Sequence, residues 1–148
     1  MTYPLDNNKL QDLLLEAEQQ IISSTPLKFI KSNSWRIENV PNTPGIYALF
    51  ENTSDLIYIG ETGNLRKRMS DLCRTVNHSF RKKLGAKRYG GVRSTKKFDD
   101  QVEGELDRFF DESLYAKFMS VNFGRLEIET YLVTKYQSQL LNSVKKRK

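Results

Sequence analysis

The sequence is poor in residues on which several kinds of protein depend. Its single cysteine, Cys73, excludes an intramolecular disulfide and fits a reducing compartment. With a single histidine, His78, it also lacks the Cys and His clusters that hold zinc. No apolar run approaches the roughly 20 residues that cross a bilayer, and the first residues lack the basic start and apolar run of a secretion signal. We therefore expect a cytoplasmic protein with no membrane partner.

Acidic residues are scarce in one part of the chain. Residues 64–97 hold twelve Lys and Arg against one acid, Asp71, so this segment carries +11 while the whole chain carries +6. Such a segment favours a nucleic-acid partner over a solvated lysine-rich face, because it is rich in arginine, whose fork suits phosphate. The expected contacts are Arg66, Lys67, Arg74, Arg81, Lys82, Lys83, Lys87 and Arg88. The basic run 145–148 would add nonspecific attraction to DNA.

Apolar residues recur at helical spacing in several segments. The first such segment predicts an N-terminal helix that runs to about Ser23, with Asp6 or Asn7 as a cap. Further helices are predicted over residues 65–72, 79–87, 98–110 and 126–140.

Other segments have the composition of strands. Residues 45–50 and 56–60 are β-rich and joined by a short polar loop, so we expect them to pair antiparallel. Partial alternation over 113–121 predicts a third strand, and residues 27–30 indicate a short extended piece. The sequence therefore predicts an α+β domain, with a small three-stranded antiparallel sheet between helices and an N-terminal helix before it.

Two tripeptides in the predicted hairpin carry a family signature. Gly45-Ile46-Tyr47 and Tyr58-Ile59-Gly60 stand ten residues apart, and the chain thereby resembles the GIY-YIG endonuclease superfamily. The match includes Arg68, ten residues after the second motif's tyrosine, and Glu129, seven residues before Tyr136. Asn142 lies one residue from the place of the family's final asparagine. The resemblance covers residues 44 to 142, and five elements in order are a much stronger signal than one tripeptide.

The resemblance implies a metal-dependent DNA endonuclease, similar to the GIY-YIG domain of the nucleotide-excision-repair incision subunit and to stand-alone members. Tyr47 would act as the base and Tyr58 would orient the water, although the reverse assignment stays open. A phenol has an ordinary pKa near 10, so it needs a neighbouring cation to act as a base at neutral pH. Arg68 would neutralise the charge of the pentavalent phosphorane.

Glu129 is the expected ligand of one Mg²⁺ or Mn²⁺, together with water and substrate oxygens. Glu127 competes for this role, but residues two apart on a helix point about 200° apart, so both cannot face one site. The spacing to Tyr136 favours Glu129.

Four other positions have open roles. His78 is expected either to contact substrate and transfer a proton or to be a cap or surface residue. Asn142 could hold the end of the metal-site helix or a water molecule, and Gly45 and Gly60 are the motif glycines. Glu61 stands where the repair branch has a lysine, and it could reduce turnover, bind a second cation or point away.

We divide the chain into an N-terminal helical extension, residues 1–43, and a GIY-YIG nuclease domain, residues 44–148. A basic, helical insertion lies at about residues 74–111. Two alternatives remain beside the active nuclease: a DNA-binding module of the same fold with weak or no turnover, and a subunit of a larger nuclease or repair assembly that docks or dimerises through residues 1–43. A role in repair, in restriction or in a mobile element is equally open.

Overall fold

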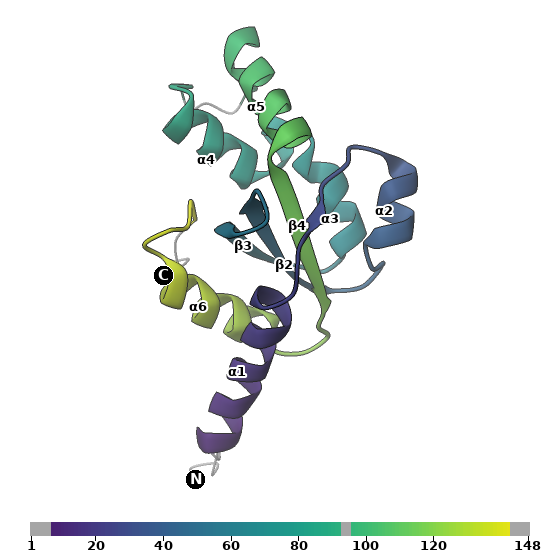
Figure 1. The fold of residues 1–148 in the computed structure, drawn as a ribbon, viewed down its shortest axis with the longest axis vertical. Helices are drawn as coiled ribbons and strands as arrows, with labels where there is room; N and C mark the ends of the chain where they lie inside the picture. Colours follow the sequence, from purple (N-terminus) through teal and green to yellow (C-terminus); the bar gives the residue numbers. More distant parts are fainter. Residues whose placement is uncertain (1–6, 93–95, 143–148) are drawn as a thin grey trace.

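The computed structural model describes residues 7–92 and 96–142. The predicted cap Asp6 and the basic run 145–148 lie outside the described residues. None of the helices within the described ranges has the length and apolar character needed to cross a membrane. In chain order the elements are α1 (Asn7–Ile22), β1 (Leu27–Lys28), α2 (Asn33–Asn39), β2 (Gly45–Glu51), β3 (Asp55–Thr62), α3 (Leu65–Leu72), the 3-10 turn η1 (Thr75–Asn77), α4 (Ser79–Arg88), α5 (Asp100–Glu112), β4 (Leu114–Ser120) and α6 (Arg125–Tyr136) (Figure 1).

The sheet has the strand order β1-β4-β2-β3, and each neighbouring pair is antiparallel. The predicted hairpin forms from β2 and β3. Its turn includes Asn52, whose φ of 57° lies in the left-handed region that asparagine tolerates. β4 pairs with β2 along its whole length, from Gly45 opposite Ser120 to Glu51 opposite Leu114. The α+β class and the antiparallel sheet are thus confirmed.

The sequence predicts three strands, whereas the sheet formed by the described residues has four. β1 is a two-residue strand that pairs with β4, with Leu27 opposite Ala116. The N–H of Phe29 extends this contact by donating to the carbonyl of Leu114 at 2.9 Å. A strand of two residues is too short to show an alternating pattern, so the sequence alone indicates only an extended piece there.

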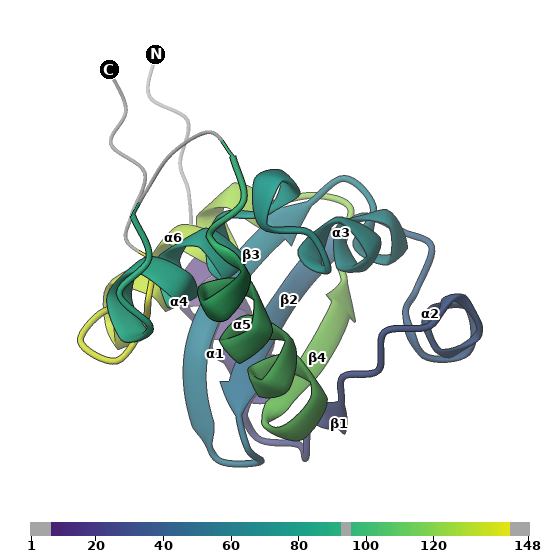
Figure 2. The ribbon, with the colours of Figure 1, turned by 90° about the horizontal axis from the view of Figure 1, so that it is seen from above.

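Helices cover both faces of the sheet, which gives the domain three layers (Figure 2). α3, α4 and α5 lie over one face, on a core that includes Leu49, Met69 and Phe110. α1 and α6 lie over the other face, on a core that includes Ile46 and Leu132. Alternate residues of β2 enter the two cores, as the two-residue period of a strand requires.

The first 43 residues contribute side chains to both cores. Ile21 of α1 is fully buried in the core under α6, whereas Phe29 and Val40 belong to the opposite core. α2 begins after Ser32, whose hydroxyl accepts the N–H of Trp35 at 3.0 Å. The Trp35 ring packs edge-on against Phe29, with centroids 5.2 Å apart. Seven residues are too few to show helical periodicity, so the sequence alone does not reveal α2.

The last helix ends earlier than its apolar pattern indicates. α6 stops at Tyr136, whereas the pattern continues to Leu140. Leu140 is nevertheless buried, because the chain returns along β3 and the N–H of Leu141 donates to the carbonyl of Ile57 at 2.8 Å. This return segment, residues 137–142, covers the outer edge of the sheet beside the candidate site.

Candidate active site

Two tyrosines from neighbouring strands face the same side of the sheet. The rings of Tyr47 and Tyr58 have centroids 6.1 Å apart and are inclined by only 21°. Gly60 lies opposite Tyr47, and a Cβ at Gly60 would overlap the phenol ring. A Cβ at Gly45 would overlap the carbonyl oxygen of Met119 on β4. The two motif glycines therefore have distinct steric roles: one admits the Tyr47 phenol and the other permits close strand pairing.

His78 contacts the first of these phenols. Its Nε2 lies 2.8 Å from the hydroxyl oxygen of Tyr47, while its Nδ1 accepts the backbone N–H of Phe80 at 2.9 Å and caps α4. Because Nδ1 is an acceptor, a neutral ring carries its proton on Nε2 and donates it to Tyr47. Burial, together with the nearby Arg68 cation, lowers the pKa of His78 to about 3. The ring is therefore a neutral donor at neutral pH.

Burial also sets the ionisation of the two tyrosines. It raises the pKa of Tyr47 far above its ordinary value and raises that of Tyr58 as well. The hydroxyl of Tyr58 lies 2.7 Å from that of Ser79, a contact that partly offsets the effect of burial on its pKa. The positive charge of Arg68 opposes the rise at both phenols. Further positive charge would be needed for either phenol to ionise near neutral pH.

Arg68 reaches the site from α3. This helix begins after Asn64, whose side-chain oxygen accepts the N–H of Lys67 at 2.9 Å. Its apolar face, formed by Leu65, Met69 and Leu72, is buried on the sheet, and the helical period of about 3.6 residues places Arg68 at the side of this face. The guanidinium donates to the carbonyl of Asn77 at 3.1 Å, which fixes its direction.

These side chains converge on one cavity of about 110 Å³. Its lining includes four of the predicted catalytic residues, contributed by β2, β3, α3 and α6, and Asn142 from the return segment. The full lining is Tyr47, Tyr58, Ile59, Gly60, Glu61, Arg68, Ser79, Lys83, Glu129 and Asn142. Ser79 is the lining residue that sequence reasoning missed, because a serine next to the only histidine resembles an ordinary helix start.

Asn142 binds the edge strand rather than the end of α6. Its side-chain oxygen accepts the N–H of Ile59 at 3.3 Å, and its side-chain nitrogen donates to the carbonyl of Ile59 at 2.6 Å. The amide thus pairs with β3 as another strand would, and it closes one side of the cavity.

Glu61 lines the rim of the cavity and is bound to a cation. It follows Gly60 on β3, so its side chain points to the opposite face of the sheet, towards α6. There its carboxylate accepts from Nε of Arg125 at 3.2 Å, and Nη1 of Arg125 donates to the carbonyl of Asn122 at 3.1 Å. The charge of Glu61 is therefore balanced within the protein.

Glu129 is the carboxylate that α6 brings to the cavity, and Glu127 is not part of the lining. Among the residues that the structure describes, no three or more His, Cys, Asp or Glu side chains gather as a metal cage. The donor set fits Mg²⁺ or Mn²⁺ all the same, because Mg²⁺ is often held by one or two carboxylates with water and substrate oxygens. The polar lining of the cavity offers such a place.

The eight basic residues expected to contact DNA differ in their exposure to solvent. Arg81 is only 2% exposed, and its guanidinium bonds to Asp107 at 2.8 Å and to Thr75 at 2.9 Å, with Glu103 at 3.3 Å. Arg81 therefore fills the interior between α4 and α5 and is not on the surface. Arg88 is exposed and forms a two-pronged ion pair with Glu51, at 2.8 and 3.0 Å.

The remaining basic residues are at least partly exposed to solvent, as contacts with DNA require. Lys83 lines the cavity itself, while Arg74 and Lys87 are exposed and Lys82 is half-buried. Arg66 donates to the carbonyl of Val40 at 3.0 Å and to that of Ile37 at 3.3 Å, so it joins α3 to the end of α2.

Comparisons with known proteins agree with this arrangement. Residues 43–142 match the family model described as the GIY-YIG catalytic domain. The chain is 40% identical over 45 residues to the UvrABC system protein C of Brucella suis, a match that covers 30% of this chain and 7% of the relative. It is 28% identical over 82 residues to the protein of that name from Neisseria meningitidis, which covers 55% of this chain and 13% of the relative.

The matched segments span only a small part of these curated relatives. No solved structure gives a significant match. The family model nevertheless covers residues 43–142, well over half of the 148 residues, and both of its motif tyrosines enter the cavity described above. The chain belongs to the GIY-YIG catalytic domain family.

Proposed function

We propose that this protein is a metal-dependent DNA endonuclease that hydrolyses phosphodiester bonds. The observation that supports this most strongly is the convergence of Tyr47, Tyr58, Arg68 and Glu129 in one cavity. Two phenols, a guanidinium and a carboxylate supply a proton acceptor, an orienting hydroxyl, a cation for the phosphorane and a metal ligand.

The hydrogen bonds favour Tyr47 as the base: its phenolate, formed with the help of Arg68 and the bound metal ion, would take the proton of the attacking water. Its oxygen accepts from Nε2–H of the neutral His78, a donor that stabilises negative charge on that oxygen. Tyr58 is bonded to Ser79 and would orient the water or the substrate. In this proposal His78 assists as a hydrogen-bond donor and is itself no base, because its Nδ1 is already bound to Phe80.

Arg68 would bind the non-bridging oxygens of the phosphate. Its guanidinium is held by the carbonyl of Asn77, so little reorganisation is needed as negative charge develops in the transition state. A divalent metal ion, Mg²⁺ or Mn²⁺, held by Glu129 would polarise the phosphate and offset the charge of the leaving 3′-oxygen. The Glu61–Arg125 ion pair leaves the rim of the cavity close to neutral, which makes the site compatible with a phosphate.

Two alternatives remain as proposals. A DNA-binding module with weak turnover is favoured by the burial of the two tyrosines, which raises the pKa of both phenols. A role within a repair assembly is favoured by the relatives named UvrABC system protein C, and in this alternative residues 1–43 would form the docking segment. The single cysteine is free and fits the cytoplasm, the compartment that we propose.

Nicking of supercoiled plasmid with Mg²⁺ or Mn²⁺ tests the proposal. We expect metal-dependent nicking that Glu129→Ala and Tyr47→Phe each reduce by at least about 100-fold, the usual scale for a lost catalytic group. Arg108→Gln is the matched control, since Arg108 is exposed on α5 and does not line the cavity. Nicking that survives Glu129→Ala would refute the assignment, and binding without nicking would favour the module. A panel of linear, nicked, branched and single-stranded DNA, with RNA, would then define the substrate.

A further inference from the structure

Two more hollows continue from the catalytic cavity along the surface of α3. The first has a volume of about 450 Å³ and shares Glu61 and Arg68 with the cavity. The second, of about 250 Å³, shares Asn64 and Lys67 with the first and reaches α2. Because each hollow shares lining residues with the next, they lie side by side along α3, and we call the two of them together the α2–α3 groove.

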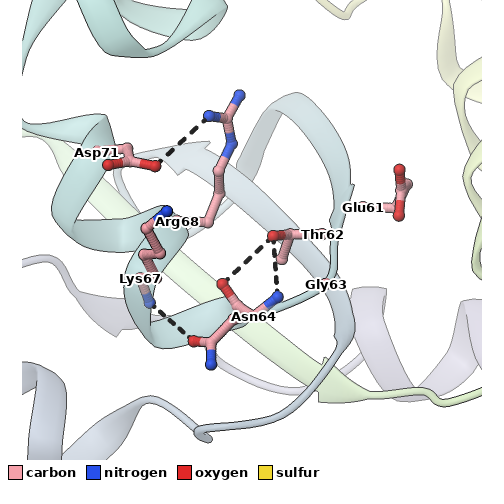
Figure 3. Close-up of a pocket in the computed structure, with 7 residues that line it drawn as sticks. All are labelled: Glu61, Thr62, Gly63, Asn64, Lys67, Arg68 and Asp71. Atoms are coloured by element: carbon pink, nitrogen blue, oxygen red, sulfur yellow. Dashed lines mark hydrogen bonds and ion pairs between the residues drawn. The ribbon is translucent and has the colours of Figure 1, made fainter.

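One face of α3 forms the floor of this groove. Asn64, Lys67, Arg68 and Asp71 are spaced by three, four and seven residues from Asn64, so they lie on one side of the helix. Figure 3 shows these four side chains along α3, with Thr62 beside Asn64 and with Glu61 set apart from them on β3. The groove therefore begins at Arg68, a proposed catalytic residue, and leads away from it.

The charge of the groove becomes more positive with distance from the cavity. Its acids near the cavity are accompanied by cations, since Glu61 pairs with Arg125 and Asp71 lies 3.9 Å from Arg68. The lining of the hollow beside α2 consists of described residues and contains no acid. It offers Arg36, Lys67 and three asparagine amides, which suit the oxygens of a phosphodiester backbone.

The far wall is held in place before any ligand binds. Trp35 fixes α2 to the sheet through ring contacts with Phe29 and with Phe118 on β4, at 5.2 and 6.3 Å. Arg66 donates to the carbonyl of Ile37 in α2 and to that of Val40, the residue that follows the helix. A preformed wall reduces the entropy that binding must remove.

We propose that the α2–α3 groove binds the sugar-phosphate backbone of the DNA strand next to the scissile bond, with Arg36 and Lys67 as phosphate contacts. This inference rests on the proposed nuclease function. Within residues 7–92 and 96–142, neither of these two cations forms an ion pair. Arg36 lies before residue 43, where the family match begins, so the N-terminal segment supplies part of the substrate site.

Salt-dependent binding of the full chain tests this proposal. The probes are a fluorescein-labelled 30-base-pair duplex and a 30-nucleotide single strand of mixed sequence, measured by anisotropy in EDTA from about 50 to 300 mM salt. Each lost phosphate contact should reduce the slope of log K against log salt by about 0.9 for the duplex and about 0.7 for the single strand. At about 0.1 M salt, this corresponds to a five- to tenfold loss of affinity for Arg36→Gln or Lys67→Gln.

Arg108→Gln again serves as the matched control, because it removes one exposed charge outside the groove. We expect this control to keep the wild-type slope. The double variant Arg36→Gln/Lys67→Gln should reduce the slope by the amount that corresponds to about two phosphate contacts. Ethylation interference adds a second readout: phosphates on one side of the cut should block wild-type binding when ethylated, and one of them should lose this effect in Arg36→Gln. If the wild type nicks plasmid while Arg36→Gln and Lys67→Gln bind like Arg108→Gln, the groove proposal is overturned and the nuclease proposal stands. If the wild type neither binds DNA nor nicks plasmid, both fall.

Discussion

Replacing His78 by asparagine should remove most of the pH dependence of stability between pH 7.5 and 5. His78 is the only histidine in the chain, so it is the one side chain whose ordinary pKa, about 6.5, lies in this window. Its burial lowers the pKa to about 3 in the folded protein. Asparagine keeps an acceptor for the N–H of Phe80 but does not titrate.

The sign follows from which state binds the proton first. As the pH falls below 6.5, the unfolded chain protonates its histidine while the folded chain does not, so protons favour unfolding. The stability that depends on the neutral His78 ring is therefore fully present above about pH 6.5, and it declines as the pH falls to about 3. Between pH 7.5 and 5 the loss amounts to about 2 kcal/mol, which corresponds to a decrease in Tm of about 4–8 °C for a chain of this size.

Urea unfolding followed by the fluorescence of Trp35, the only tryptophan, measures this loss at several pH values. The relevant quantity is the difference in the free energy of unfolding between wild type and His78→Asn. Carboxylates that begin to titrate near pH 5 contribute equally to both proteins and cancel in this difference. NMR titration of the single imidazole gives the pKa directly. A difference that changes by less than about 0.5 kcal/mol over the window, or an imidazole that titrates near pH 6.5, would refute this account of the buried neutral ring.

Three further predictions concern the packing of the site. Gly60→Ala should lower the free energy of unfolding by about 1–3 kcal/mol and abolish nicking, since a Cβ overlaps the Tyr47 phenol; Gly63→Ala, with open space around it, should have little effect in the same melts. Asn142→Ala should cost about 1–3 kcal/mol and speed hydrogen exchange of the Ile59 amide, and an unchanged rate would contradict the pairing. Glu18→Gln should destabilise the protein by about 1–3 kcal/mol in thermal unfolding, because three donors on α6 bind this carboxylate, whereas the exposed Glu16→Gln should not.

Much of the fold could be predicted because its signals are local. The hairpin follows from two β-rich runs and a polar loop, and it brings Tyr47 and Tyr58 to one face of the sheet. The buried face of α3 follows from Leu65 and Met69 at helical spacing. α2 is too short for a pattern and could not be found in this way, and at β1 the sequence indicates only an extended piece.

The contacts missed from sequence join residues far apart in the chain. Arg81 is enclosed by Glu103 and Asp107, partners 22 and 26 residues away, so a basic run in the sequence does not indicate its burial. Likewise, Glu61 meets Arg125 at a separation of 64 residues, and no local pattern reports such a pair. Pairing between distant charges depends on the tertiary fold, and only the structure reveals it.

The return segment after α6 has a consequence for how the molecule behaves in concentrated solution. An outermost strand normally exposes backbone groups that can recruit a strand from another chain and start aggregation. In β3 these groups already have partners within the chain. Gln139 donates to the carbonyl of Leu56, the N–H of Leu141 donates to that of Ile57, and Asn142 bonds both backbone groups of Ile59. A protein shortened to Tyr136 would lose this cover and present an adhesive strand next to the candidate cavity, so the segment protects solubility as well as forming a wall of the site.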